Sequence, residues 1–192
     1  MPSPIGHSLA GLSIGMAYAL PKGASFRDLG VSMYRRRGIL LASIALANLP
    51  DIDYLPGLFA GDFNAYHHHY SHTLGWLVLV SLGIWMIWKS FNSSITFRHF
   101  SFIFIATGSH LILDFFTRNT SYPYGIMLFW PFSNEHYLSG NPLFWNPQKS
   151  DWGEVFQWYN VQVMIMDAVY TSAMIGMVLL YKRYTSPARP VI

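Results

Sequence analysis

Histidine and aspartate side chains gather at four places in this chain. His7 lies near the start, Asp51 and Asp53 occupy a PDID motif, and His110 and Asp114 lie in the segment SHLILD. Four further histidines fill the motif HHHYSHT, and there is no cysteine. Imidazole nitrogen and carboxylate oxygen are the ligands that divalent transition metals take when thiolate is absent. The four motifs therefore predict a divalent metal site.

The spacing within two of these motifs suits metal binding on a helix. His110 and Asp114 are four residues apart, so a helix would present both side chains on one face. His72 stands at helical spacing from both His68 and His69. A buried aspartate in an apolar run needs a partner, which a metal ion or a hydrogen-bonded histidine would each provide. The SHLILD motif alone is equally consistent with either.

The elements that must position these side chains are apolar runs. Of the 192 residues, 52% are hydrophobic and 11% are charged, against about 25% charged residues in a typical soluble domain. Five apolar runs occupy residues 8–20, 38–49, 73–88, 100–116 and 155–181. Most are shorter than the roughly 20 residues of a full membrane span. Together they predict one domain over 1–192, an all-α, membrane-embedded bundle of about five helices with a metal site at one end. A compact, aromatic-rich soluble protein is the less favoured alternative.

The charges indicate how the helices are arranged. Basic residues stand at one end of each run, and the candidate ligands stand at or near the other end; Arg118 is the exception. If the helices alternate in direction, the basic ends share one side of the membrane. The positive-inside rule places that side in the cytoplasm. We therefore expect a multi-pass protein of the inner (cytoplasmic) membrane with its metal site toward the outer side, and no nucleic-acid partner.

This orientation makes a labelling prediction. Single cysteines placed at Ser90 and Ser121 should react with an impermeant thiol reagent from opposite faces of the membrane, because the two positions flank opposite ends of the predicted bundle. The chain has no cysteine of its own, so each label reports one site. Labelling of both positions from the same face would refute the alternating arrangement.

The order of the motifs resembles that of one family. Gly6–His7, PDID, an H-x-x-x-x-H-S/T box, an S-H-x-x-x-D helix and a P-x-G-x-x-L-x-W-P-F segment recur in the LexA-regulated, inner-membrane, metal-dependent hydrolases. The resemblance covers roughly residues 5–133. The metal ligands that it implies are His7, Asp51, Asp53, His67, His72, His110 and Asp114. The family box usually reads H-R-G-x-T-H-S, and His68 and His69 replace its Arg and Gly here. That change removes a positive charge that could hold a phosphate, and it leaves open whether His67 or His68 is the ligand.

The resemblance implies a membrane-bound, metal-dependent hydrolase. Its ligand pattern is also distantly similar to that of the zinc-dependent phospholipases C, so a phosphoester or lipid-like, amphiphilic substrate and contact with membrane lipid are expected. One or two ions, zinc before manganese or iron, would lower the pKa of water from 15.7 to about 7 and polarise the bond to be cut. Asp51, Asp53 and His72 are the candidate catalytic residues, and either aspartate could bridge two ions or act as general base.

Two other functions remain as alternatives. The chain could be a non-enzymatic metal-binding membrane protein, either a transporter or a protein with a structural metal. A transporter needs polar groups across the whole membrane, whereas these gather in one layer. A structural zinc needs four protein ligands, and seven candidates exceed that number for one ion. The third hypothesis is a His–Asp layer that transfers protons without metal.

Overall fold

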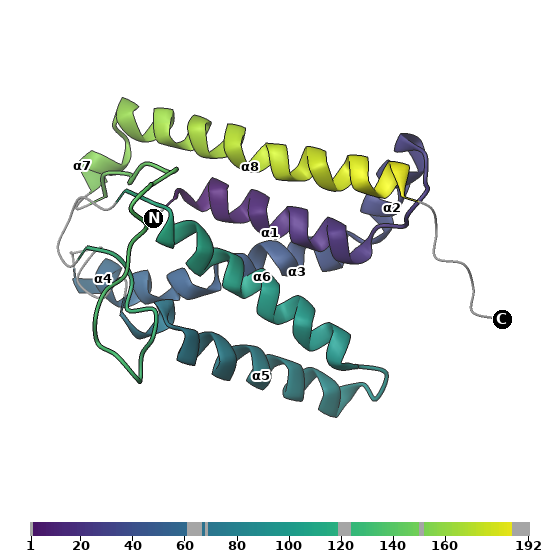
Figure 1. Cartoon of the computed structure of the whole chain (residues 1–192), viewed down its shortest axis with the longest axis horizontal. Coiled ribbons are helices and arrows are strands. Elements are labelled where there is room, and N and C mark those ends of the chain that lie inside the picture. Colours follow the sequence, from purple (N-terminus) through teal and green to yellow (C-terminus); the bar gives the residue numbers. More distant parts are fainter. Residues whose placement is uncertain (1, 61–66, 68, 119–123, 150–151, 186–192) are drawn as a thin grey trace.

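The computed structural model describes residues 2–60, 67, 69–118, 124–149 and 152–185, and these form a helical bundle (Figure 1). The α-helices of the described part are α1 (Pro4–Ala19), α2 (Phe26–Arg35), α3 (Arg37–Ala47), α4 (Tyr54–Ala60), α5 (Leu74–Phe91), α6 (Phe97–Phe115), α7 (Trp152–Val155) and α8 (Trp158–Tyr184). Two short 3₁₀ helices are η1 (Leu49–Asp53) and η2 (Tyr70–His72). The five apolar runs correspond to α1, α3, α5, α6 and α8, which confirms the predicted all-α bundle.

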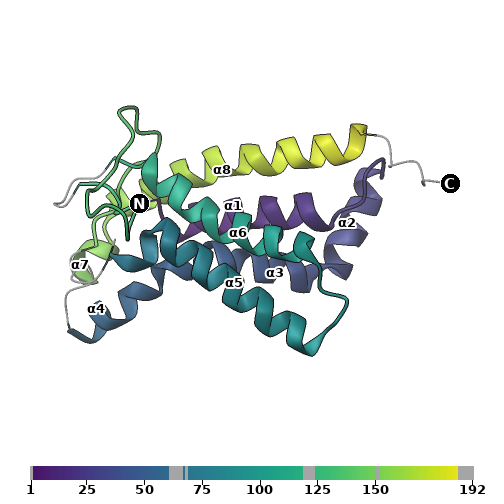
Figure 2. The ribbon, with the colours of Figure 1, turned by 60° about the horizontal axis from the view of Figure 1, so that its bottom comes forward.

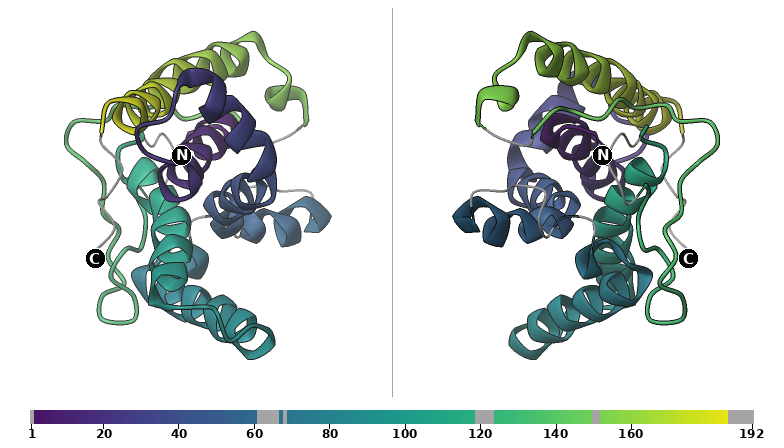
Figure 3. Two further views of the ribbon diagram at one scale, coloured as in Figure 1. Left: turned by 90° about the vertical axis from the view of Figure 1, so that its right-hand side faces the viewer. Right: turned by 90° about the vertical axis from the view of Figure 1, so that its left-hand side faces the viewer.

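Helix α1 lies at the centre of the bundle. It contacts α3, α6 and α8, and the two end-on views in Figure 3 show it between α8 and the other two. Gly11 and Gly15, one turn apart, permit the close approach to α3. A Cβ at Gly11 would lie only 2.6 Å from the carbonyl oxygen of Ser43. Small residues at this spacing let two helix backbones pack closely. The packing carries His7, at the start of α1, into the interior.

Two of the described helices, α5 and α8, are long and apolar enough to cross a membrane. The pair Arg37–Ala47 and Leu49–Gly57, bent by 53°, could add a third, broken span. Much of the outer surface of α5 is apolar, with Leu79 67% and Ile87 63% exposed. Exposed leucine and isoleucine at this density suit contact with lipid chains rather than water.

The bend between α3 and α4 is the element that presents the PDID motif. Pro50 cannot continue the hydrogen bonding of α3, which ends at Ala47. Asn48 follows, and its side-chain amide donates to the carbonyl of Ile44 and to Ser8 Oγ of α1. The chain then turns through η1, so both aspartates lie at the end of the bundle where α1 begins.

The basic residues Arg98 of α6 and Lys182 of α8 lie beside the end of α1, at the other end of the bundle, as predicted. Lys182 Nζ donates to the carbonyl of Leu20 at 2.8 Å, and Arg98 Nη2 donates to that of Tyr18 at 3.2 Å. Figure 2 shows the α5–α6 turn at this same end, together with α2 and the end of α8. The side of the membrane that this end faces stays a prediction, and Ser121 lies outside the described residues.

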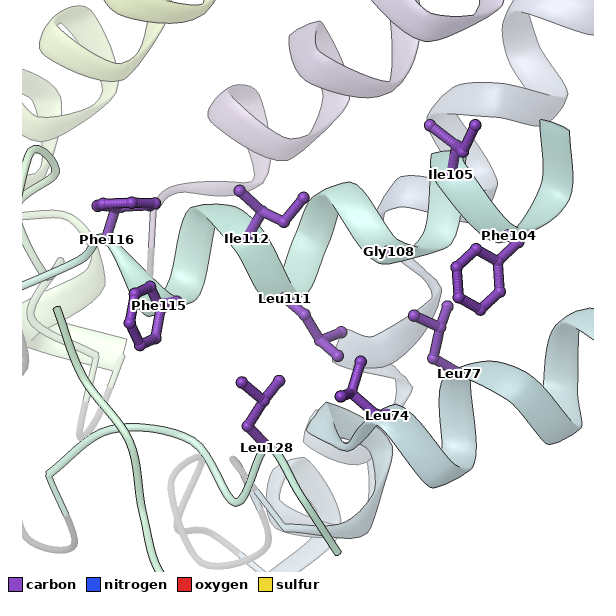
Figure 4. Close-up of a pocket in the computed structure, with 10 residues that line it drawn as sticks. All are labelled: Leu74, Leu77, Phe104, Ile105, Gly108, Leu111, Ile112, Phe115, Phe116 and Leu128. Atoms are coloured by element: carbon purple, nitrogen blue, oxygen red, sulfur yellow. The ribbon is translucent and has the colours of Figure 1, made fainter. Parts of the chain in front are cut away.

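Residues 124–149 fold over the opposite end of the bundle (Figure 1). Leu74, the first residue of α5, donates its N–H to the carbonyl of Leu128 at 2.9 Å. An apolar groove of about 370 Å³ forms beside this contact. Figure 4 shows its lining, with Leu74 and Leu77 of α5 facing Leu111 and Phe115 of α6. The segment thus fastens the start of α5 to the end that holds the candidate ligands.

Candidate metal centre

The structure brings all seven predicted ligands together. They form three overlapping triads, in which one ligand atom of each residue lies within 4.8 Å of the others: His7–His110–Asp114, Asp51–His72–His110 and Asp53–His67–His72. The residues come from α1, η1, η2 and α6 and from the loop before η2. His72 and His110 each belong to two triads, so the cluster is continuous. Whether these residues ligate a metal stays a prediction.

The central triad has the dimensions of a coordination shell. Nε2 of His72 lies 3.1 Å from Nε2 of His110, and Asp51 Oδ1 lies 3.7 Å and 3.4 Å from these two nitrogens. Ligands about 2.0–2.1 Å from a tetrahedral zinc ion are about 3.3 Å apart. Asp114 Oδ2 lies 3.3 Å from each of the same nitrogens. The triad therefore matches one face of such a shell in size.

Hydrogen bonds aim both central imidazoles at the cluster. His110 Nδ1 lies 2.7 Å from the carbonyl oxygen of Ala47, which assigns the ring proton to Nδ1 and leaves the lone pair on Nε2. His72 Nδ1 lies 3.1 Å from Asp53 Oδ2, an oxygen that also accepts from Ser71 Oγ at 2.6 Å. A carboxylate or carbonyl behind a histidine is the usual support for a metal-ligating imidazole.

Several buried polar atoms of the cluster have no hydrogen-bond partner among the described residues. They are both ring nitrogens of His7, Oδ1 of Asp51 and both carboxylate oxygens of Asp114. Burying such groups without a partner costs about 1–3 kcal/mol each, and more when they are charged. A divalent cation would satisfy carboxylate oxygens and imidazole lone pairs together. The nitrogen and oxygen donor set fits zinc, manganese or iron.

His67 and His7 complete the cluster on opposite sides. His67 Nδ1 lies 3.0 Å from Asp53 Oδ1, and burial lowers the pKa of His67 to about 4, so the ring is neutral at physiological pH. His68 lies outside the described residues. The ring of His7 stacks on that of His110 at 3.8 Å, and its Nε2 lies 3.4 Å from Asp114 Oδ1.

Residues outside the predicted set position the cluster. The backbone N–H of Ser3 donates to Asp167 Oδ2 at 2.5 Å, which fixes the start of α1 one turn before His7. The sequence could have indicated the role of Asp167, because an acidic residue in an apolar run needs a partner. Ser71 had only its place beside His72 to indicate a role. The carbonyl of Ala47 carries no signal in the sequence, because any residue could provide it.

The fold and the cluster define a class: an all-helical membrane protein with buried His/Asp groups that could hold a metal ion. A family model described as YdjM inner membrane protein matches residues 1–186. The chain therefore belongs to the YdjM inner membrane protein family. No curated protein and no solved structure matches it. The predicted inner-membrane family is thus confirmed, while LexA regulation, hydrolase activity and the likeness to phospholipases C stay predictions.

Proposed function

We propose that this chain is a membrane-bound, metal-dependent hydrolase acting on a phosphoester or lipid-like substrate. The observation that supports it most is the triad of Asp51, His72 and His110. Provided that Asp114 pairs with His7 and does not complete the shell, three protein ligands leave the fourth position of a tetrahedral zinc ion open. An open position is the arrangement of catalytic rather than structural zinc sites. Zinc is the ion we expect, and manganese or iron would suit the same donors.

The hydrogen bonds of the two central histidines support the binding of one ion at the centre of the cluster. His110 Nδ1 lies beside the Ala47 carbonyl, and His72 Nδ1 lies beside Asp53, so the Nε2 atoms of the two rings face one another at the centre of the cluster. A second ion would rest on donors outside these two rings, such as His7 with Asp114 Oδ1. We therefore expect at least one ion per chain.

The exposure of the carboxylates distinguishes an open side of the cluster from a closed one. The side chains of Asp51 and Asp53 are 13% and 12% exposed, whereas that of Asp114 is 1% exposed. When bound, the ion would polarise the scissile bond and lower the pKa of water. Both oxygens of Asp53 already contact His67, His72 and Ser71, so Asp53 orients imidazoles. Asp51 is therefore the better candidate to accept a proton on the open side, through the carboxylate oxygen that would not bind the ion.

The proposal includes the orientation of the site. The basic end, with Lys182 and Arg98, faces the cytoplasm, and the cluster lies toward the outer side of the inner membrane. The convergence of the basic residues at one end supports this orientation through the positive-inside rule. The labelling of a cysteine at Ser90 from the cytoplasmic face tests it.

The second candidate is a non-enzymatic metal site. The complete burial of His7 and His110, with Asp114 almost as buried, favours it, because a closed site suits a structural ion.

An activity assay separates the hydrolase from the structural metal site. We expect the zinc-loaded chain to hydrolyse bis(p-nitrophenyl) phosphate or a short-chain phospholipid, and Asp51→Ala to lower the rate by about 10²-fold or more. The exposed His69 in the same motif gives the control, His69→Ala, which should keep its activity.

Zinc bound with full occupancy, together with inactivity on phosphomonoesters, phosphodiesters and phospholipids, would contradict the hydrolase and favour the structural site.

A further inference from the structure

A short segment between α6 and α8 is fixed beside the cluster. We call residues 146–149 the strap. Asn160 is 3% exposed, its Oδ1 accepts from the N–H of Gln148 at 2.8 Å, and its Nδ2 donates to the carbonyl of Gln148 at 2.6 Å. Tyr159 Oη donates to the carbonyl of Asn146 at 3.2 Å. Two consecutive residues of α8 thus hold the strap backbone, which places the next residue, Lys149.

The strap directs the Lys149 side chain toward the cluster. Lys149 Nζ contacts the hydroxyl of Tyr54 and lies 4.6 Å from the centre of that ring. The Tyr54 ring stacks on His67 at 4.0 Å, so a single aromatic ring separates the ammonium from a candidate ligand. An ammonium has three donors, and Tyr54 is the hydrogen-bond partner of Lys149 in the described part of the chain.

Lys149 is a partly buried cation in a neighbourhood of carboxylates. Burial lowers the pKa of Lys149 to about 7, while the charges of Asp51 and Asp53 act against that shift. An ion on the cluster would neutralise those carboxylates. An anion bound at the ammonium would then replace the negative charge of the carboxylates and keep Lys149 protonated.

A cavity adjoins the ammonium. It has a volume of about 210 Å³, and its walls include Pro2 of the chain start, Pro147 of the strap, Val155 of α7 and Met164 of α8. Tyr54 and Lys149 line the same cavity. An apolar cavity with a cation at its edge fits an amphiphilic molecule whose apolar part fills the cavity and whose charged group meets the cation.

We propose that Lys149 binds the phosphate group of an amphiphilic substrate, whose apolar part occupies this cavity while the phosphate faces the His/Asp cluster. This inference rests on the proposed metal-dependent function and adds its substrate class and a binding residue. Lysine binds phosphate as a point charge, so its position beside the cluster decides where the phosphate lies. The phosphate could be a lipid headgroup or belong to a small soluble molecule.

The test is a calorimetric titration of the full-length, zinc-loaded chain in a nonionic detergent. The probes are inorganic phosphate and a short-chain alkylphosphonate, whose carbon–phosphorus bond the proposed hydrolase would not cleave. We expect Lys149→Gln to weaken phosphate binding by about 10- to 100-fold, the loss expected for a charge-assisted hydrogen bond, and Lys149→Arg to keep most of it. Lys89→Gln changes the net charge equally at the other end of the bundle and should have no effect. Tighter binding of the alkylphosphonate than of phosphate would assign the site to a phosphate group that carries an apolar chain, as in a lipid.

Zinc content, measured on the same samples, separates the two proposals. Unchanged phosphate affinity in Lys149→Gln with normal zinc would overturn this inference and leave the metal-dependent function standing. If Lys149→Gln loses both its zinc and its phosphate binding, Lys149 has a structural role, and the inference is overturned as well. Equal affinity for the two probes would overturn the assignment of the cavity to an apolar group. A wild-type chain that binds no zinc would instead contradict the proposed function.

Discussion

Replacing His110 with alanine is expected to abolish zinc binding by the purified chain. His110 belongs to two of the three triads, and its Nε2 lies within 3.4 Å of His72 Nε2, Asp51 Oδ1 and Asp114 Oδ2. Weakening a residue that only supports a ligand lowers metal affinity by about 10- to 100-fold. Loss of a central ligand should exceed that range. Competition titration with a zinc-binding dye measures the dissociation constant.

Two further variants make this result specific to the cluster. His69→Ala removes an exposed histidine from the HHHYSHT motif and should leave zinc affinity unchanged. Asp53→Asn should lower it by about 10- to 100-fold, because Asp53 supports His72 from behind. A His110→Ala chain that is folded and binds zinc as tightly as the wild type would show that the cluster is not the zinc site.

Chelation of the metal is expected to lower the thermal stability of the bundle. Without an ion, the carboxylates of Asp51 and Asp114 and the ring of His7 remain buried with unsatisfied atoms at the junction of α1, η1 and α6. A ligand present at 1,000 times its dissociation constant stabilises the folded state by about 4.1 kcal/mol. For a chain of this length, each kcal/mol corresponds to roughly 2–4 °C, so chelator should lower the melting temperature by roughly 10 °C.

The dependence on the ion itself is the control for this effect. Added zinc should restore the melting temperature of the wild type, and Asp114→Asn should respond weakly to chelator and to zinc alike. An identical melting temperature with and without chelator, in a wild type shown to lose its zinc, would mean that the ion contributes nothing to the fold. The cluster would then have to be stable through internal His–Asp hydrogen bonds.

The helices of the bundle were predictable because their apolar runs are separated by prolines, basic residues and polar turns. Pro21 and Pro50 lie just past the ends of α1 and α3, and the runs between such breaks became helices. Helix α2 lies outside the five apolar runs, between the first and the second of them. Its start carries a usable signal, because Ser25 and Asp28 form a reciprocal capping box. Helix α4 follows Pro50, contains Pro56 and also lies outside the apolar runs.

The cluster was predictable because histidine and aspartate are rare in apolar sequence and were placed at one end of each helix. Their hydrogen-bond support was not, since it depends on contacts between distant segments. Lys149 is the clearest case. It contacts Tyr54 from 95 residues away, and the hydrogen bonds of Tyr159 and Asn160 to the strap bring it there. Nothing local to Lys149 distinguishes it from a solvated loop lysine.

Elemental analysis of the wild-type chain, purified from the membrane without chelator, tests the central claim most directly. The buried triad of Asp51, His72 and His110 predicts at least one divalent transition metal ion per chain, with zinc the expected element. A chain that contains no metal in repeated preparations, and that takes up none from added zinc, manganese or iron, would contradict the metal site and every function proposed for it.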